Sequence, residues 1–485
     1  MDLVVRTEHG AVRGTVDGEI SAFKGIPYAA PLDGPRRFQA PVAPERWVGV
    51  RDASAFSASV PQPAIMPGVP PLWNPGDGTD CLSLNIWTPD LGGGLPVMVW
   101  IHGGAYLGGA TDSPAYDGTR LASGGVVVVT VNYRVGYEGF GWVADAPANR
   151  GILDQLAALR WVRENIAAFG GDPGNVTIFG ESAGATSVAA LVAGSAGQGL
   201  FRRGIAQSLG SLFCGEDEAR KIGELITGGL GVPATAEALG AVPSEAIHAA
   251  QTPVMREMDA DRAAWTNSTA YAVVLDGEVL SELPWVALRS GAARDVDLIS
   301  GYNTDEAKMF TIGLPAEAKD PAAMAQGLRL APSVVDEYRV GYPGIEDAEL
   351  FTAMLSDQLF RMPSTWLAEG QAAAGGRSYL YEFSWPAPSL GGVLGACHGL
   401  DVPFTFGVAE SEITASMFGD VVPPDFEELS GELRKAWVSF ATIGDPGWPA
   451  YTAADRSARI WNAPPTVVAD PIKPSREIWQ HRFAA

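Results

Sequence analysis

Residues 176–194 read VTIFGESAGATSVAALVAG, a short apolar run followed at once by a stretch of small residues. The run VTIFG is typical of a buried strand and ATSVAALVAG is typical of a helix, so the chain must turn sharply between them. In such a turn the central residue adopts strained backbone angles, and the residues two positions to either side must be small. Gly180 and Gly184 meet that demand around Ser182. The pattern predicts a tight turn that lifts Ser182 out of a sheet.

Other segments predict strands and helices in alternation. Residues 95–101 (LPVMVWI) and 126–133 (VVVVTVNY) are continuous apolar runs, as strands buried on both faces require. Residues 151–169 place apolar side chains at three- and four-residue steps, which is typical of an amphipathic helix. Further strands are expected at 296–303 and 378–385. This order predicts an α/β fold with a mostly parallel central sheet flanked by helices.

We expect one domain, residues 1–485, although this length exceeds the size at which a single core usually stops growing. No repeat, low-complexity tract or clear linker divides the chain. Residues 215–285 and 312–375 are expected to be insertions of mixed helix and loop. Residues 58–80 form a long proline-rich loop that contains Trp73. Loops of this length often form the rim of a functional site, and the alternative is a plain connector.

The composition and charge exclude several classes of partner. The formal net charge is −23, and so acidic a surface repels phosphate backbones and anionic lipid. We therefore expect neither nucleic acid nor a membrane as a partner. The start of the chain does not resemble a signal peptide, and no window reaches the roughly 18 apolar residues of a membrane helix. A cytoplasmic monomer or weak homo-oligomer is expected.

The turn at Ser182 has the features of a nucleophile elbow. The N-terminal N–H groups of the following helix are aimed at the serine, where negative charge develops during acyl transfer. A phosphate-type turn or a chance match is the alternative. The glycine-rich stretch HGGAYLGG (102–109), directly after the strand at 95–101, presents further backbone N–H groups. With the N–H of Ala183, it is expected to form an oxyanion hole, unless it is a turn without a ligand.

A serine nucleophile needs a base, and the chain contains five histidines. His398 lies in ACHGLDVPF, a loop bounded by glycine and proline, and is the preferred base. His102 is its one serious competitor, and a structural role for His398 is the alternative. His9 and His481 lie near the ends of the chain, and His248 is expected on an exposed helical turn.

The base needs a carboxylate that holds its tautomer and stabilises the imidazolium. In the chain order serine, acid, histidine, this group should follow a strand between Ser182 and His398. The stretch LISGYNTDEAKMF (298–310) offers Asp305 and Glu306. Spacing alone does not separate these neighbours, and an exposed acidic turn is the alternative.

These segments together resemble the type-B carboxylesterase/lipase family of α/β-hydrolases, which includes bacterial p-nitrobenzyl esterases and the cholinesterases. The resemblance runs over nearly the whole chain. It is carried by FKGIPYAAP (23–31), DCLSLNIWTP (80–89), WIHGGAYLGG (100–109), VNYRVGYEGF (131–140), GILDQLAALRWVRENIAAFGGDPGNVTIFGESAG (151–184), GYNTDEAKMF (301–310) and HGLDVPFTFG (398–407).

The resemblance implies an α/β-hydrolase fold with helical insertions around the active-site mouth. The acid in that family is a glutamate, which favours Glu306 over Asp305. Ser182, Glu306 and His398 then match the family's triad. The oxyanion donors match Gly104, Ala105 and Ala183, and Gly103 and Glu181 are expected in supporting roles.

The function that the resemblance implies is that of a serine carboxylesterase, which hydrolyses small-molecule esters through an acyl-enzyme without a metal or organic cofactor. One alternative is the same triad acting on a lactone, carbamate, amide or phthalate-type polyester. The other is a binding protein, as in family members that have lost the nucleophile. The intact triad and the lack of a membrane segment argue against it.

Overall fold

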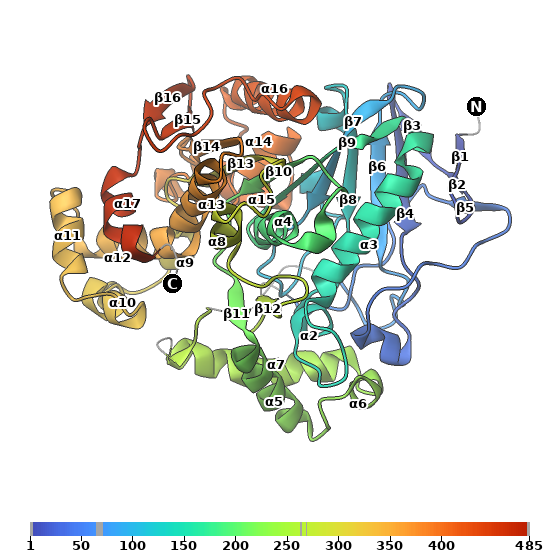
Figure 1. Ribbon diagram of the computed structural model, residues 1–485, viewed down its shortest axis with the longest axis horizontal. Coiled ribbons are helices and arrows are strands. Elements are labelled where there is room, and N and C mark those ends of the chain that lie inside the picture. The colour runs from blue at the N-terminus through green and yellow to red at the C-terminus, as the bar shows by residue number, and fades with distance from the viewer. Residues whose placement is uncertain (1–2, 65–70, 262–263, 268, 483–485) are drawn as a thin grey trace.

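The turn predicted at Ser182 is present in the computed structural model, which describes residues 3–64, 71–261, 264–267 and 269–482 (Figure 1). Strand β9 (Gly171–Glu181) ends immediately before Ser182, and helix α4 (Ala183–Ala193) begins immediately after it. Ser182 has φ 56° and ψ −121°, a conformation that is costly for a residue with a side chain. A Cβ atom on Gly184 would lie 2.0 Å from the carbonyl oxygen of Ile101, so only glycine fits there.

The main sheet, within the described residues, has eleven strands and is parallel through its middle. Seven neighbouring strands from β15 to β8 pair in parallel, and the remaining pairings near the two edges are antiparallel. This arrangement confirms the predicted mostly parallel sheet. In spatial order the strands are β16 (Thr466–Ala469), β15 (Ser457–Trp461), β14 (Ser378–Phe383), β13 (Asp297–Asn303), β10 (Arg203–Gln207), β9, β7 (Leu95–Ile101), β8 (Val127–Val131), β6 (Ser83–Thr88), β4 (Ile20–Pro27) and β3 (Thr15–Asp17).

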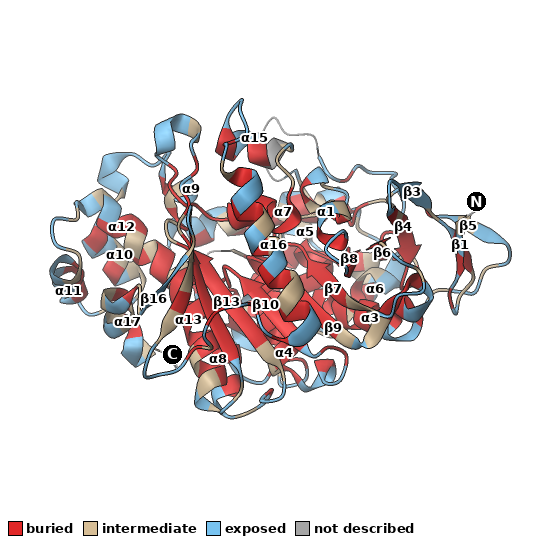
Figure 2. Cartoon of the chain, turned by 90° about the horizontal axis from the view of Figure 1, so that it is seen from above, coloured by how far each residue is buried: buried red, intermediate tan, exposed pale blue. Residues whose placement is uncertain are grey.

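Helices cover both faces of this sheet because successive side chains of a buried strand enter two different apolar clusters. In β7, Val97 and Val99 belong to one cluster, whereas Met98 and Trp100 belong to the other. Figure 2 shows the buried strands at the centre, with exposed residues on the surrounding helices. The first cluster includes residues of α3 (Arg150–Asn165), α4, α8 (Pro284–Arg289) and α13 (Met362–Ala373), and the second those of α1 (Thr119–Ala122), α14 (Asp401–Phe406) and α16 (Phe426–Ile443).

The segments expected as insertions are largely helical, and Figure 1 shows two groups of helices away from the main sheet. One difference is a two-stranded parallel sheet of β11 (Phe213–Gly215) and β12 (Val273–Leu275), which the sequence analysis did not predict. The first group is α5 (Glu216–Leu230), α6 (Ala236–Gly240) and α7 (Ser244–Ala260), and the second is α10 (Pro321–Gly327), α11 (Val334–Gly341) and α12 (Asp347–Ser356).

The remaining elements are short. A three-stranded sheet contains β1 (Val4–Arg6), β2 (Ala11–Arg13) and β5 (Val50–Asp52), and β1 pairs antiparallel with β2. The other helices are α2 (Gly136–Phe140), α9 (Lys308–Thr311), α15 (Glu412–Phe418) and α17 (Lys473–Trp479), with 3₁₀ turns η1 (Gly34–Phe38), η2 (Pro114–Tyr116), η3 (Ile166–Phe169), η4 (Ser195–Gly197), η6 (Ala316–Ala318), η8 (Ser389–Gly392) and η9 (Gln480–Arg482), and the π-helical turn η7 (Asp357–Arg361).

A buried ion pair joins the segment after β8 to helix α3 and to η1. The guanidinium of Arg134 donates to both carboxylate oxygens of Asp154, at 2.8 and 2.7 Å, and both side chains are fully buried. Its third nitrogen donates to the carbonyl oxygens of Arg37 and Gln39, at 2.9 and 2.7 Å. The charge of Arg134 is therefore balanced by one carboxylate. Its remaining N–H groups bind the backbone at and just after η1.

Asp154→Ala should lower the free energy of unfolding by roughly 3–5 kcal/mol, because it leaves the Arg134 charge buried without a partner. Chemical denaturation followed by tryptophan fluorescence would measure the loss. The matched control is Glu427→Ala, which breaks the exposed pair with Arg120 and should leave the midpoint nearly unchanged, since solvent screens such pairs. Equal midpoints for Asp154→Ala and the parent would contradict this account.

Candidate active site

The glycine-rich loop after β7 has an unusual backbone. Gly104, Ala105 and Tyr106 have φ values of 113°, 55° and 57°, so three successive residues lie in the left-handed region. In the part of the chain that the structure describes, the N–H groups of Gly104, Ala105 and Ala183 donate to no protein acceptor. Ala183 opens helix α4, where the first N–H groups have no partner within the helix. An anionic oxygen bound between the two loops could accept hydrogen bonds from these N–H groups.

His102 is a structural residue of this loop. Its Nδ1 lies 2.8 Å from the carbonyl oxygen of Gly103, and its ring stacks on Tyr133 with centroids 4.4 Å apart. The hydroxyl of Tyr133 donates to the carbonyl oxygen of His102 at 2.7 Å. Burial lowers the pKa of His102 to about 4, so the imidazole is neutral at neutral pH. These contacts hold the loop in place and make His102 unsuitable as a mobile base.

His398 and Glu306 are in direct contact. The Nδ1 of His398 lies 2.6 Å from Oε2 of Glu306, whose side chain is fully buried. The other carboxylate oxygen of Glu306 accepts a hydrogen bond from the N–H of Asn303 at 2.8 Å. Asp305 instead accepts from the N–H of Ala396 at 3.0 Å and pairs with a lysine. Of the two neighbouring carboxylates, Glu306 is therefore the one that orients the imidazole.

Glu181 contacts the opposite nitrogen of the same ring. Its Oε1 lies 3.1 Å from Nε2 of His398, and both side chains are about nine-tenths buried. Within the described residues, no hydrogen bond joins the hydroxyl of Ser182 to His398. Because Glu181 directly precedes Ser182, the imidazole lies at the turn that carries the serine. The sequence predicted only a supporting role for Glu181, and nothing in the motif indicated this contact.

The charges around His398 set its protonation. Burial alone lowers the pKa of His398, but the carboxylates of Glu181 and Glu306 outweigh burial and raise the pKa to about 9. Burial raises the pKa of Glu181, against the attraction of His398. The imidazole and Glu181 therefore each stabilise the charged form of the other.

Two phenylalanines cover the imidazole. Phe360 stacks on His398 with ring centroids 4.1 Å apart and planes at 29°, and Phe310 lies at 5.6 Å. Phe310 belongs to α9, which begins two residues after Glu306, whereas Phe360 belongs to η7. The sequence analysis named neither residue, because an apolar residue in a helical stretch gives no sign of facing a functional group.

His248 lies on helix α7. His248 was expected on an exposed helical turn, and this is wrong: it is buried, and its ring packs edge-on against Trp73 with ring centroids 5.8 Å apart.

Residues 65–70 of the predicted rim loop lie outside the described residues. In the described part, Gln62 exchanges hydrogen bonds of 3.0 and 2.7 Å with Gly109, at the end of the glycine-rich loop.

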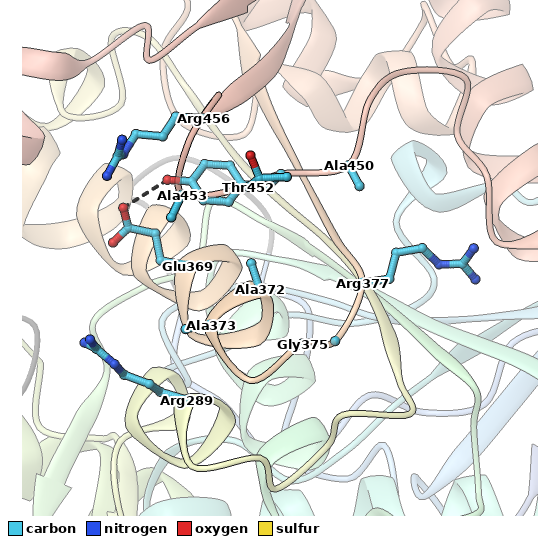
Figure 3. A pocket seen from close by; sticks show the side chains of 12 residues that line it. Arg289, Glu369, Ala372, Ala373, Gly375, Arg377, Ala450, Thr452, Ala453 and Arg456 are labelled. Carbon is cyan, nitrogen blue, oxygen red and sulfur yellow. Dashed lines mark hydrogen bonds between the residues drawn. The ribbon is translucent and has the colours of Figure 1, made fainter.

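A separate cavity of about 530 Å³ lies between α13 and the segment after α16 (Figure 3). It is lined by Glu369, Tyr451 and Arg456 among others, and by none of the site residues predicted from the sequence.

The three cysteines, Cys81, Cys214 and Cys397, are free and buried. Among the described residues, no cluster of three histidine, cysteine, aspartate or glutamate side chains is placed to hold a metal ion. No described helix combines the length and apolar character needed to cross a membrane.

The sequence is similar to that of several known proteins. The model of the carboxylesterase family matches residues 1–340 and 343–467. The chain is 35% identical to para-nitrobenzyl esterase from Bacillus subtilis over 98% of both chains, and 34% identical to fumonisin B1 esterase from Sphingopyxis macrogoltabida over 93% of this chain and 84% of that protein. It is 32% identical to phenmedipham hydrolase from Pseudarthrobacter oxydans over 94% of both chains.

Solved structures show the same likeness. A carboxylesterase from Geobacillus stearothermophilus superposes with a TM-score of 0.86 at 37% identity, covering 99% of this chain and all of that one. A PNB esterase superposes with a TM-score of 0.86 at 34% identity and 99% coverage of both chains. The fold is thus that of the α/β-hydrolases, and the class of protein is a carboxylic ester hydrolase. More particularly, the chain belongs to the carboxylesterase family.

Glu181→Gln should lower the pKa of His398 from about 9 toward its ordinary value of 6.5, because the substitution removes a negative charge that stabilises the imidazolium. Titration of ¹⁵N-histidine-labelled protein by NMR would follow the ring directly. Glu138→Gln is the control, since Glu138 is equally buried but pairs with Arg37 instead. An unchanged or higher pKa in Glu181→Gln would refute the assignment.

Proposed function

We propose that Ser182, His398 and Glu306 are the catalytic triad of a serine carboxylesterase. In this proposal Nε2 of His398 leaves Glu181 and accepts the proton of Ser182 as its oxygen attacks the ester carbonyl. Glu306 stabilises the resulting imidazolium, which then protonates the departing alcohol. Water activated by the same imidazole hydrolyses the acyl-enzyme and restores Ser182.

The oxyanion of both tetrahedral intermediates is proposed to bind to the N–H groups of Gly104, Ala105 and Ala183. The observation that carries the proposal is that these three donors have no acceptor among the described residues, next to a serine held in a strained turn. Preorganised donors of this kind typically contribute about 2.7–4 kcal/mol each to lowering the barrier. Gly103 supports the loop, because a Cβ on it would lie 3.2 Å from that of Ser182.

The substrate is proposed to be a small-molecule ester, and the same triad acting on a lactone, carbamate, amide or phthalate-type polyester is the second candidate. The relatives favour testing both, because para-nitrobenzyl esterase, fumonisin B1 esterase and phenmedipham hydrolase are named for different substrates. A panel of p-nitrophenyl esters from acetate to palmitate, with aryl and phthalate diesters, a lactone and a carbamate, would rank the classes by kcat/KM.

We also propose a domain organisation, a cellular location and an oligomeric state. The chain is proposed to be one domain, with residues 58–80 at the rim of the site, and the contact between Gln62 and Gly109 supports that placement. A cytoplasmic location and a monomer or weak homo-oligomer without nucleic-acid partners are proposed from the sequence and its net charge of −23.

Ser182→Ala should lower kcat for p-nitrophenyl acetate by a factor on the order of 10⁶, since loss of a serine nucleophile removes the covalent pathway. An organophosphate should label the parent at Ser182, as peptide mass spectrometry would show, and should not label this variant. Ser195→Ala, at an exposed serine after the same helix, is the control and should retain activity and labelling. Undiminished hydrolysis by Ser182→Ala would exclude the proposed mechanism.

A further inference from the structure

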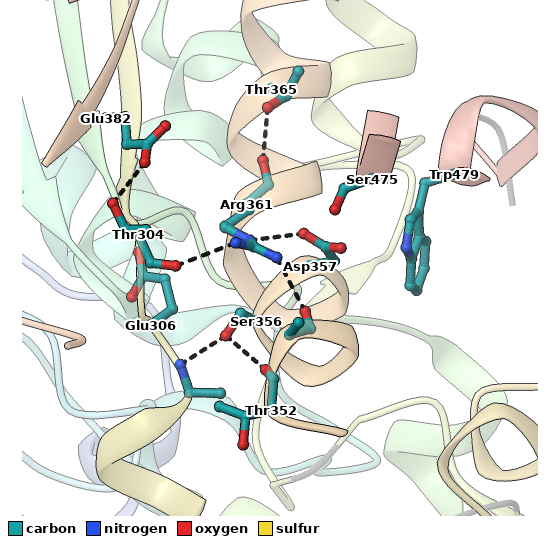
Figure 4. Close-up of polar contacts among 12 residues, drawn as sticks. Thr304, Glu306, Thr352, Ser356, Asp357, Arg361, Thr365, Glu382, Ser475 and Trp479 are labelled. Atoms are coloured by element: carbon teal, nitrogen blue, oxygen red, sulfur yellow. Dashed lines mark hydrogen bonds and ion pairs between the residues drawn. The ribbon is translucent and has the colours of Figure 1, made fainter. Parts of the chain in front are cut away.

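Helices α12 and α13 are joined by the π-helical turn η7, which lies beside the candidate site. A π-helical turn holds an extra residue per turn, so it changes the direction of the side chains that follow, and such turns are frequent at functional sites. Here the turn contains an ion pair in which Nε of Arg361 donates to Asp357 at 2.7 Å. Both side chains are buried. Figure 4 shows the pair among the surrounding polar contacts.

Two hydrogen bonds from this region bracket Glu306. The hydroxyl of Ser356 accepts from the N–H of Ala307 at 3.0 Å, and Nη1 of Arg361 donates to the carbonyl oxygen of Thr304 at 3.2 Å (Figure 4). The backbone that carries Glu306 is thus held on both sides by residues at the two ends of η7.

The same turn also reaches the base. Phe360, the residue before Arg361, stacks on the imidazole of His398 at 4.1 Å. One face of the ring is therefore covered by Phe360, while its Nδ1 is held by Glu306. Because Ser356, Phe360 and Arg361 are linked by one helical backbone, the acid and the base are positioned from one piece of structure.

A chain of buried hydrogen bonds holds the turn from behind. The hydroxyl of Tyr338, on α11, donates to the second carboxylate oxygen of Asp357. The indole N–H of Trp479, on the C-terminal helix α17, donates to that hydroxyl at 2.6 Å. Both rings are buried, so the contacts run without solvent from Trp479 through Tyr338 and Asp357 to Arg361.

We infer that Ser356–Arg361, anchored by Tyr338 and Trp479, is a positioning element that sets the relative placement of Glu306 and His398 during ester hydrolysis. The inference rests on the proposed function, in which these two side chains act together. Misplacing reacting groups by about 1 Å can cost on the order of 100-fold in rate. Loosening the anchor should therefore lower kcat, whereas substrate binding and hence KM should change little.

The first test compares two buried tyrosines that each donate to a carboxylate. Tyr338→Phe removes the contact with Asp357, and Tyr451→Phe removes a 2.9 Å contact with Glu369 at the separate cavity. Tyr338→Phe should lower kcat for p-nitrophenyl acetate by roughly tenfold at unchanged KM. Tyr451→Phe should keep the parent kcat, with thermal unfolding confirming that both variants are folded at the assay temperature.

The second test separates positioning from simple packing. Phe360→Leu should lower kcat and shift the acid limb of the kcat/KM profile to lower pH. Water reaching the imidazole would relieve the burial that lowers the pKa of His398 and would also screen the two carboxylates that raise it. Because the carboxylates outweigh burial, the net change should be a fall of the pKa from about 9 toward its ordinary value of 6.5. Phe360→Tyr retains the stacked ring and should restore both quantities.

The outcomes distinguish the inference from the function on which it rests. Equal losses of kcat in Tyr338→Phe and Tyr451→Phe, or a parent-like profile in Phe360→Leu, would overturn the positioning role while leaving the triad intact. Hydrolysis that survives Ser182→Ala would instead overturn the proposed function.

Discussion

The close packing of the Ser182 turn against the end of β7 is the constraint on which the candidate site depends. A side chain at Gly184 would collide with the carbonyl oxygens of Ile101 and His102, so α4 begins directly against the last residues of β7. Because β7 and β9 are parallel neighbours, their carboxyl ends meet at one edge of the sheet. This brings together, beside one serine, N–H groups from two separate loops that have no acceptor in the described part of the chain.

The histidine is held by opposing electrostatic effects. Burial disfavours a charged imidazole, and the two carboxylates that contact its two nitrogens favour it. The carboxylate of Glu306 is fixed by a hydrogen bond from the backbone N–H of Asn303, whereas Glu181 lies on the side from which the serine proton would arrive in the proposed mechanism. In the structure, Nε2 of His398 therefore contacts Glu181. The proposed catalysis requires Nε2 to leave Glu181 and to contact the next residue, Ser182, instead.

Local sequence patterns predicted the parts of the fold that local sterics determine. The two glycines around Ser182 were enough to predict the tight turn, and the apolar run at 95–101 was enough to predict strand β7. The choice between Asp305 and Glu306 needed the family resemblance, because spacing does not distinguish adjacent carboxylates. In the structure, Glu306 contacts His398 whereas Asp305 accepts from the N–H of Ala396. His248 was misjudged because Trp73, which covers it, comes from a loop about 175 residues earlier in the chain. The π-helical turn was not predicted, because its distinguishing contacts are tertiary: Asp357 accepts from Tyr338, and Arg361 donates to the backbone of Thr304.

Cys397 directly precedes His398 in the chain, yet burial raises the pKa of its thiol to about 12. A thiolate beside the proposed base would compete with the proposed nucleophile for electrophiles. Because the thiol of Cys397 stays protonated and away from solvent, Ser182 is left as the more reactive of the two groups in the proposed mechanism.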